Sequence, residues 1–202
     1  MIEKIREIFK SEASAIEKIP INNSFEDAIG IIHRQVHGKN GKLVTSGMGK
    51  AGQIAHNIAT TFSSTGTPAA FLHPSEAQHG DLGILQENDV LLAISNSGKT
   101  REIIELIDLK NKLYPLIPVI VITGNENSPL AQKADCFILT GAPPEVCPLG
   151  LTPTTSTTIM TVIGDALVVL LMEKIGFNAN DYAKRHHGGY LGMKSREVSG
   201  KD

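Results

Sequence analysis

Val90-Leu-Leu-Ala-Ile94 is an apolar run that leads directly into the polar sequence Ser95-Asn-Ser-Gly-Lys-Thr100. Consecutive apolar residues bounded by turn residues are typical of a strand buried on both faces, as in a parallel sheet between helix layers. Similar runs occur at 43–45, 69–72, 119–123 and 137–139, alternating with helical patterns. The chain is therefore predicted to be a doubly wound α/β protein, a three-layer α-β-α sandwich around a five-stranded parallel sheet.

Two helices are expected ahead of this core, within residues 1–40. The first carries apolar residues at helical spacing, at positions 2, 5, 9, 13 and 16, so its apolar stripe needs a partner surface, which another subunit could supply. The second is predicted to begin at the N-cap Ser24 and to end at Gly38. It contains His33 and His37, the only i,i+4 histidine pair in the sequence, which we interpret as facing solvent.

The composition is that of a soluble globular protein. The 202 residues suit one domain, 41% of them are hydrophobic, and the net charge of −2 lacks the basic excess that nucleic acids or anionic membranes attract. We therefore expect neither nucleic acid nor membrane as a partner. The segment 157–175 is interrupted by charges and fits a buried helix better than a membrane span. With two cysteines and a charged N-terminus, the chain is expected to be cytoplasmic, with reduced thiols.

The first glycine-rich loop is Gly47-Met-Gly-Lys-Ala-Gly52, which follows a predicted strand and opens a predicted helix. Its G-x-G-x-x-G spacing is that of a dinucleotide-binding turn. Such a fold also needs an acidic residue after the second strand to bind the ribose hydroxyls. Only Glu76 is available for this, and it comes late, so dinucleotide binding remains an alternative.

The second loop, at 95–100, ends in the Gly-Lys-Thr of a P-loop. The first P-loop glycine is missing, because Ala93 occupies its position inside the predicted strand, and too little loop remains to wrap a triphosphate. The hydroxyls of Ser95, Ser97 and Thr100, with backbone N–H groups at a helix start, suit a single phosphate monoester better. The alternative is a simple helix cap and turn.

Several longer segments point to one family. They are Val44-Thr-Ser-Gly-Met-Gly-Lys50, Thr61-Phe-Ser-Ser-Thr-Gly-Thr-Pro68, His73-Pro74, His79-Gly-Asp-Leu-Gly83, Ile94-Ser-Asn-Ser-Gly98, Cys147-Pro-Leu-Gly-Leu-Thr-Pro-Thr-Thr-Ser-Thr157 and Gly164-Asp-Ala166. Together they resemble the sugar isomerase (SIS) domain, and within it the arabinose-5-phosphate isomerases of Kdo biosynthesis. The resemblance implies a flavodoxin-like or Rossmann-like domain over 1–202, with helices in 1–40 and the α/β core and C-terminal helices in 41–202. It also implies interconversion of D-ribulose 5-phosphate and D-arabinose 5-phosphate, feeding lipopolysaccharide or capsule synthesis.

The chain departs from the family pattern in three places. Lys99 stands where the family usually has glutamate, and His187 stands where it usually has proline. Family members often carry a pair of CBS domains, whereas this sequence ends at Asp202, so we expect no CBS regulation. Feedback by CMP-Kdo, the end product of the pathway, would then require binding to the isomerase domain itself.

Moving a proton between C1 and C2 through an enediol requires a base, a proton relay and stabilisation of the enediolate. The residues that match the family's functional positions are Lys50, His79, Glu102, Glu145 and His186. Glu145 is expected to be the base, since it lies in the stiff loop 143–148, while the histidines would open the sugar ring or relay protons. The phosphate is expected among Ser46, Ser95, Asn96, Ser97 and Thr100.

Each of these residues also has an ordinary structural interpretation. Lys50 could be a solvated lysine at a helix start, Glu102 a carboxylate favoured by a helix dipole, and the histidines surface residues. His187 competes with His186 for the same role. Cys136 and Cys147 lack C-x-x-C spacing, and Cys136 is expected to be buried, so neither a metal nor a redox cofactor is predicted.

The resemblance further implies a homotetramer with composite active sites, to which His79 or His186 would come from a neighbouring subunit. Two other functions remain open. One is another SIS activity, such as isomerisation of a hexulose phosphate. The other is a non-catalytic sensor that binds a sugar phosphate or a nucleotide sugar.

Overall fold

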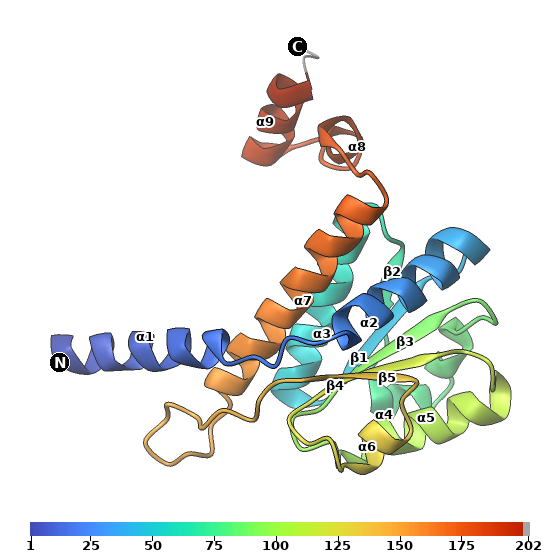
Figure 1. Ribbon diagram of the computed structural model, residues 1–202. Coiled ribbons are helices and arrows are strands. Elements are labelled where there is room, and N and C mark those ends of the chain that lie inside the picture. The colour runs from blue at the N-terminus through green and yellow to red at the C-terminus, as the bar shows by residue number, and fades with distance from the viewer. Residues whose placement is uncertain (200–202) are drawn as a thin grey trace.

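The computed structural model, which describes residues 1–199, contains one parallel five-stranded sheet with strand order β2-β1-β3-β4-β5 (Figure 1). The strands are β1 Leu43–Gly47, β2 Ala69–Phe71, β3 Val90–Ile94, β4 Val119–Thr123 and β5 Cys136–Leu139. In the centre of the sheet, β1 pairs with β3 so that Ser46 lies opposite Ala93. This confirms the predicted fold class and its five strands.

Helices cover both faces of the sheet and bury alternate residues of each strand (Figure 1). Val90, Leu92 and Ile94 of β3 pack with one set of helices, and Leu91 and Ala93 pack with the other. The first set is α2 Ser24–Ile32, α3 Gly49–Ser64 and α7 Thr155–Lys174; the second is α4 Pro74–Ala77, α5 Arg101–Leu113 and α6 Pro129–Gln132. Each central strand is covered by helices on both faces, and this explains why the strands appear in the sequence as near-continuous apolar runs.

Helix α7 is long and apolar enough to cross a membrane, judged by its length and composition alone. Half of its most apolar 18-residue window is buried inside the protein, with Ile163 and Leu167 packed in the core next to α3. The helix therefore serves as a core element of the sandwich, as the charges within it led us to expect.

Two details of the second predicted helix differ from expectation. Ser24 is the first helical residue, and not the cap, because Oδ1 of Asn22 accepts the hydrogen bond from its N–H at 2.9 Å. After α2 the helix continues as a π-helical turn, His33–His37. His33 and His37 do not simply face solvent: both are half-buried, their rings stack 5.8 Å apart, and Nε2 of His37 lies 3.1 Å from the Thr67 hydroxyl. Burial, and then the charge of His33, lower the pKa of His37.

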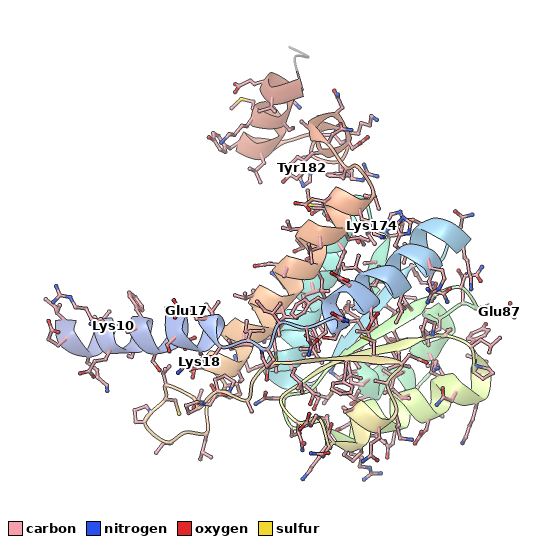
Figure 2. All side chains as sticks on the ribbon, in the orientation of Figure 1. Lys10, Glu17, Lys18, Glu87, Lys174 and Tyr182 are labelled. Atoms are coloured by element: carbon pink, nitrogen blue, oxygen red, sulfur yellow. The ribbon has the colours of Figure 1, made fainter. Side chains whose placement is uncertain are left out.

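Both ends of the described chain extend away from this body (Figure 1). Helix α1, Ile2–Glu17, buries none of its residues, and its side chains around Lys10 stand clear of the rest of the molecule (Figure 2). At the other end, α8 Ala179–Ala183 and α9 Gly189–Ser199 contact each other beyond the C-terminal end of α7. The last three residues of the expected domain lie outside the described part of the chain.

Candidate active site

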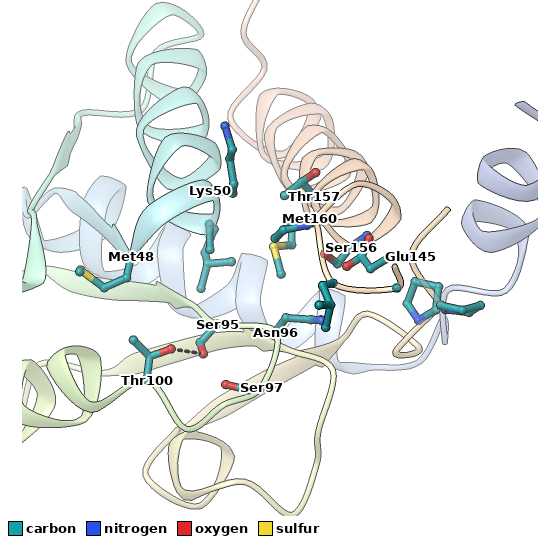
Figure 3. A pocket seen from close by; sticks show the side chains of 17 residues that line it. Met48, Lys50, Ser95, Asn96, Ser97, Thr100, Glu145, Ser156, Thr157 and Met160 are labelled. Carbon is teal, nitrogen blue, oxygen red and sulfur yellow. Dashed lines mark hydrogen bonds between the residues drawn. The ribbon is translucent and has the colours of Figure 1, made fainter. Parts of the chain in front are cut away.

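A cavity of about 530 Å³ lies beyond the carboxyl ends of β1 and β3, where three helices begin (Figure 3). Lys50 and Ala51 line it from the first turn of α3, Thr100 from the N-cap of α5, and Ser156 and Thr157 from the first turn of α7. Helix N-termini carry partial positive charge and free N–H groups. An anionic group is therefore favoured in this cavity over a cation.

The glycine-rich turn 47–52 is explained by close packing of the backbone. A β-carbon on Gly52 would lie 2.5 Å from the carbonyl oxygen of Gly47, and one on Gly47 would lie 2.8 Å from the backbone of Ala51. Glycine at these two positions lets α3 start directly against the end of β1. Glu76, the acidic residue considered for a ribose, is exposed on α4 and does not line the cavity.

The loop 95–100 presents hydroxyl groups at the floor of the cavity. The hydroxyls of Ser95 and Thr100 share a 2.7 Å hydrogen bond, and the N–H of Gly98 donates to Oγ of Ser95 at 3.2 Å (Figure 3). Gly98 has a φ of 63°, and a β-carbon on it would overlap the Ser128 side chain. The loop is thus held in one conformation, with Ser97 and Asn96 exposed.

Glu145 stands at the start of α7, on the loop that closes the cavity (Figure 3). Its Oε2 accepts hydrogen bonds from the N–H of Thr154 at 2.7 Å, from the Thr154 hydroxyl at 2.9 Å and from the N–H of Ser156 at 3.2 Å. Burial raises the pKa of this carboxyl, but the hydrogen bonds from Ser156 and Thr154 outweigh it, so the pKa lies below its ordinary value of 4.5. Glu145 is therefore an ionised, firmly oriented carboxylate.

The same loop carries the thiol of Cys147. Its Sγ accepts a hydrogen bond from the N–H of Thr152 at 3.2 Å. Hydrogen bonds from the backbone and side chain of Thr152, with those from Leu151 and Leu149, lower the pKa of Cys147 to about 7. Cys136 is buried as expected, and burial raises its pKa to about 11.

Of the residues predicted from the sequence, six line this one cavity: Lys50, Ser95, Asn96, Ser97, Thr100 and Glu145. The other four do not line it. Ser46 is fully buried in β1 and donates its hydroxyl to the carbonyl of Leu72 at 2.8 Å. Glu102 lies in the first turn of α5, next to the cavity residue Thr100.

The two predicted histidines lie outside the cavity for different reasons. His79 is exposed in the turn after α4 and is not among the residues that line the cavity. His186 follows α8, where its ring stacks on Tyr182 at 3.7 Å and its Nδ1 lies 3.0 Å from the carbonyl of Tyr182. Helix α7 has 20 residues, about 30 Å at the usual rise, and separates His186 from the cavity of the same chain.

Our sequence reasoning assigned no role to Ser156 and Thr157, which line the cavity from α7. The run Thr154-Thr-Ser-Thr157 after Pro153 could have indicated them, because it is typical of a helix start ahead of a long apolar segment. No group of three or more His, Cys, Asp or Glu side chains suited to a metal ion occurs within residues 1–199.

Comparison with known proteins places this site in a family. The sequence pattern of the SIS domain matches residues 37–170. Arabinose 5-phosphate isomerase KdsD of Escherichia coli K12 is 51% identical over 154 residues, which are 76% of this chain and 46% of that protein. The chain thus spans about half the length of the curated relatives that it matches.

Two solved structures match over almost their whole length. A protein from Bacteroides fragilis, assigned as a phosphosugar isomerase involved in capsule formation, has a TM-score of 0.93 and 64% identity, covering 94% of this chain and 99% of its own. A protein from Escherichia coli CFT073, solved in complex with arabinose 5-phosphate, has a TM-score of 0.85 and 35% identity, covering 92% and 96%. The chain therefore belongs to the SIS domain family.

Proposed function

We propose that this protein is a cofactor-free aldose–ketose isomerase that interconverts D-ribulose 5-phosphate and D-arabinose 5-phosphate. The observation that carries the proposal is that Glu145 lines the same cavity as the hydroxyl loop 95–100, within a ring of three helix N-termini. The similarity to KdsD and to a structure solved with arabinose 5-phosphate supports the choice of substrate.

In the proposed mechanism the phosphate binds at Ser95, Ser97 and Thr100, supported by Asn96 and the start of α5. This leaves C1 and C2 of the open-chain sugar near Glu145. The carboxylate removes the proton from C1 of the ketose, which gives an enediolate, and returns a proton to C2 to form the aldose. Lys50 stabilises the negative charge that develops on the oxygen atoms.

The remaining residues complete the proposal. Glu102, in the first turn of α5 beside the loop 95–100, is proposed to take part in catalysis, while His79 and His186 open the ring or relay the proton between O1 and O2. Ser46 supports the site from within the sheet, because its hydroxyl ties the end of β1 to Leu72.

We also propose that the protein is a homotetramer, in which 1–202 is one SIS domain and His186 serves a neighbouring copy. The α8–α9 arm extends away from its own cavity, and Ile2, Ile5 and Phe9 of α1 are 67%, 44% and 69% exposed, so both arms offer apolar surface. A dilute monomer with full activity would contradict this assembly.

The cellular context is part of the same proposal. The product would feed Kdo synthesis in the cytoplasm, for lipopolysaccharide or capsule. We further propose that CMP-Kdo competes for this cavity. Calorimetry should then show heat with CMP-Kdo that arabinose 5-phosphate abolishes, and the absence of heat would remove this ligand from the account.

Proton NMR of ribulose 5-phosphate in deuterated buffer tests the function. We expect arabinose 5-phosphate with deuterium at C2, activity lost in Glu145→Gln, and activity kept in Glu87→Gln, an exposed carboxylate away from the cavity (Figure 2). Faster turnover of a six-carbon ketose phosphate would instead support the hexulose phosphate activity. Binding of arabinose 5-phosphate without turnover would support a sensor.

A further inference from the structure

We infer that Glu12 of α1 is a positioning residue for Glu145, and that it acts through the first turn of α7. The inference rests on the proposed role of Glu145 as the base. Oε1 of Glu12 accepts a hydrogen bond from the hydroxyl of Thr155 at 3.0 Å, and Thr155 is almost fully buried. The end of α1 contacts α7 where α7 begins (Figure 1).

Two carboxylates thus accept hydrogen bonds from three consecutive residues at the start of α7. Glu145 accepts those from the N–H groups of Thr154 and Ser156, and Glu12 accepts the one from the hydroxyl of Thr155. Both carboxylates lie at the positive end of the helix dipole. If the Thr155 contact is lost, this turn is free to fray, and the donors that orient Glu145 fray with it.

The environment of Glu12 indicates a purpose other than stability. Its side chain is half-buried, and Oε2 is shielded from solvent with no hydrogen-bond partner within residues 1–199. A buried carboxylate oxygen without a partner lowers stability. A glutamate at position 12 is explained if its hydrogen bond to Thr155 fixes the geometry of the first turn of α7. Structural costs of this kind are concentrated at functional sites.

Loss of the charge of Glu12 and loss of its hydrogen bond to Thr155 should shift the pKa of Glu145 in opposite directions. The charged groups around Glu145 are Glu12 from α1, Lys50 from α3 across the cavity, and Lys18, which lines the small hollow behind Pro143 and Pro144. Removing the negative charge of Glu12 should lower the pKa of Glu145 by Coulomb's law. Loss of positioning should raise it, because the hydrogen bonds that stabilise the ionised form weaken.

The test compares Glu12→Ala and Thr155→Val with Glu12→Gln, which keeps an acceptor oxygen, and with Glu7→Gln, an exposed carboxylate on the same helix. Two quantities are measured: the pKa of Glu145 from the ¹³C shift of its carboxyl group, and the acid limb of the kcat/KM profile. In Glu12→Ala and Thr155→Val we expect both to move upward, with kcat falling about tenfold, the value of one hydrogen bond to a charged group. In Glu12→Gln, kcat should stay within about twofold of wild type, since the amide oxygen still accepts the Thr155 hydrogen bond, and the pKa of Glu145 should not rise, because only the charge of Glu12 is lost.

Three results would overturn the inference. They are a downward shift in Glu12→Ala, a profile that matches Glu7→Gln, or a loss of thermal stability with kcat and both titrations unchanged. The double variant of Glu12→Ala and Thr155→Val should add nothing to either single change. The ¹³C titration needs no turnover, so an inactive wild-type protein would refute the proposed function while the titration still decides the role of Glu12.

Discussion

Replacing Gly98 by alanine tests how the loop 95–100 is built. Gly98 has a φ of 63°, and a β-carbon there would overlap the Ser128 side chain and lie 2.9 Å from Oγ1 of Thr123. The left-handed backbone costs a non-glycine residue about 1–2 kcal/mol, and overpacking adds roughly 1–3 kcal/mol. Gly98→Ala should therefore lower the free energy of unfolding by about 2–5 kcal/mol.

Gly176→Ala is the matched control. Its φ is 66°, but no atom lies within 4 Å of the β-carbon position, so only the backbone cost of about 1–2 kcal/mol applies. Urea denaturation measures both variants. Because the overlap displaces the loop that presents Ser95 and Ser97, KM for the sugar phosphate should rise in Gly98→Ala and stay unchanged in Gly176→Ala.

Equal stability of the two variants, or an unchanged KM in Gly98→Ala, would refute this reasoning. If Gly98→Ala does not fold, the double variant with Ser128→Gly removes the two nearest overlapping atoms, leaves the 2.9 Å contact to Thr123, and should recover folded protein. It should still lack the cap of α6, where Oγ of Ser128 accepts a hydrogen bond from the N–H of Ala131, at a cost of roughly a few tenths of a kcal/mol. No recovery at all would contradict the steric explanation.

Three further predictions concern the loop that closes the cavity. Glu145→Gln should lower kcat by about 10²–10⁴ while calorimetry finds inorganic phosphate binding unchanged; unchanged turnover would exclude it as the base. The pKa of Glu145 is lowered, so its carboxylate should contribute stability fully above pH 4.5, and the difference in unfolding free energy between wild type and Glu145→Gln should shrink as pH falls below that value. Alkylation of Cys147 by iodoacetamide should reach half its maximal rate near pH 7, with buried Cys136 unreactive there; a rise only above pH 9 would contradict the thiolate geometry.

The core could be predicted because burial acts on each strand locally. In β3 every residue from Val90 to Ile94 is fully buried, so apolar character on both faces identified a parallel strand without knowledge of its neighbours. Helix α7 could be predicted in the same way: charges interrupt its apolar sequence, which favoured a buried helix over a membrane span, and half of its apolar window is buried. The N-cap was misplaced by one residue: it is Asn23, and Ser24 is already helical, with its N–H donated to the side chain of Asn22.

The site was only partly predictable, because it depends on contacts between distant segments. The loop 95–100 follows β3 directly, so Ser95 and Thr100 could be placed beyond the end of this strand from the turn alone. Ser46 faces Leu72 inside the sheet, and no local pattern showed that its hydroxyl is already engaged. The contact between Glu12 and Thr155 spans 143 residues, and only the packing of α1 on α7 brings them together.

A crystal structure of the Glu145→Gln protein with arabinose 5-phosphate would show how the cavity holds the sugar phosphate. We predict that the phosphoryl oxygens lie within hydrogen-bond distance of Ser95, Ser97 and Thr100, and that C1 and C2 of the sugar contact residue 145. A phosphoryl group bound at the turn 47–52, or a sugar whose C1 and C2 lie out of reach of residue 145, would contradict the account.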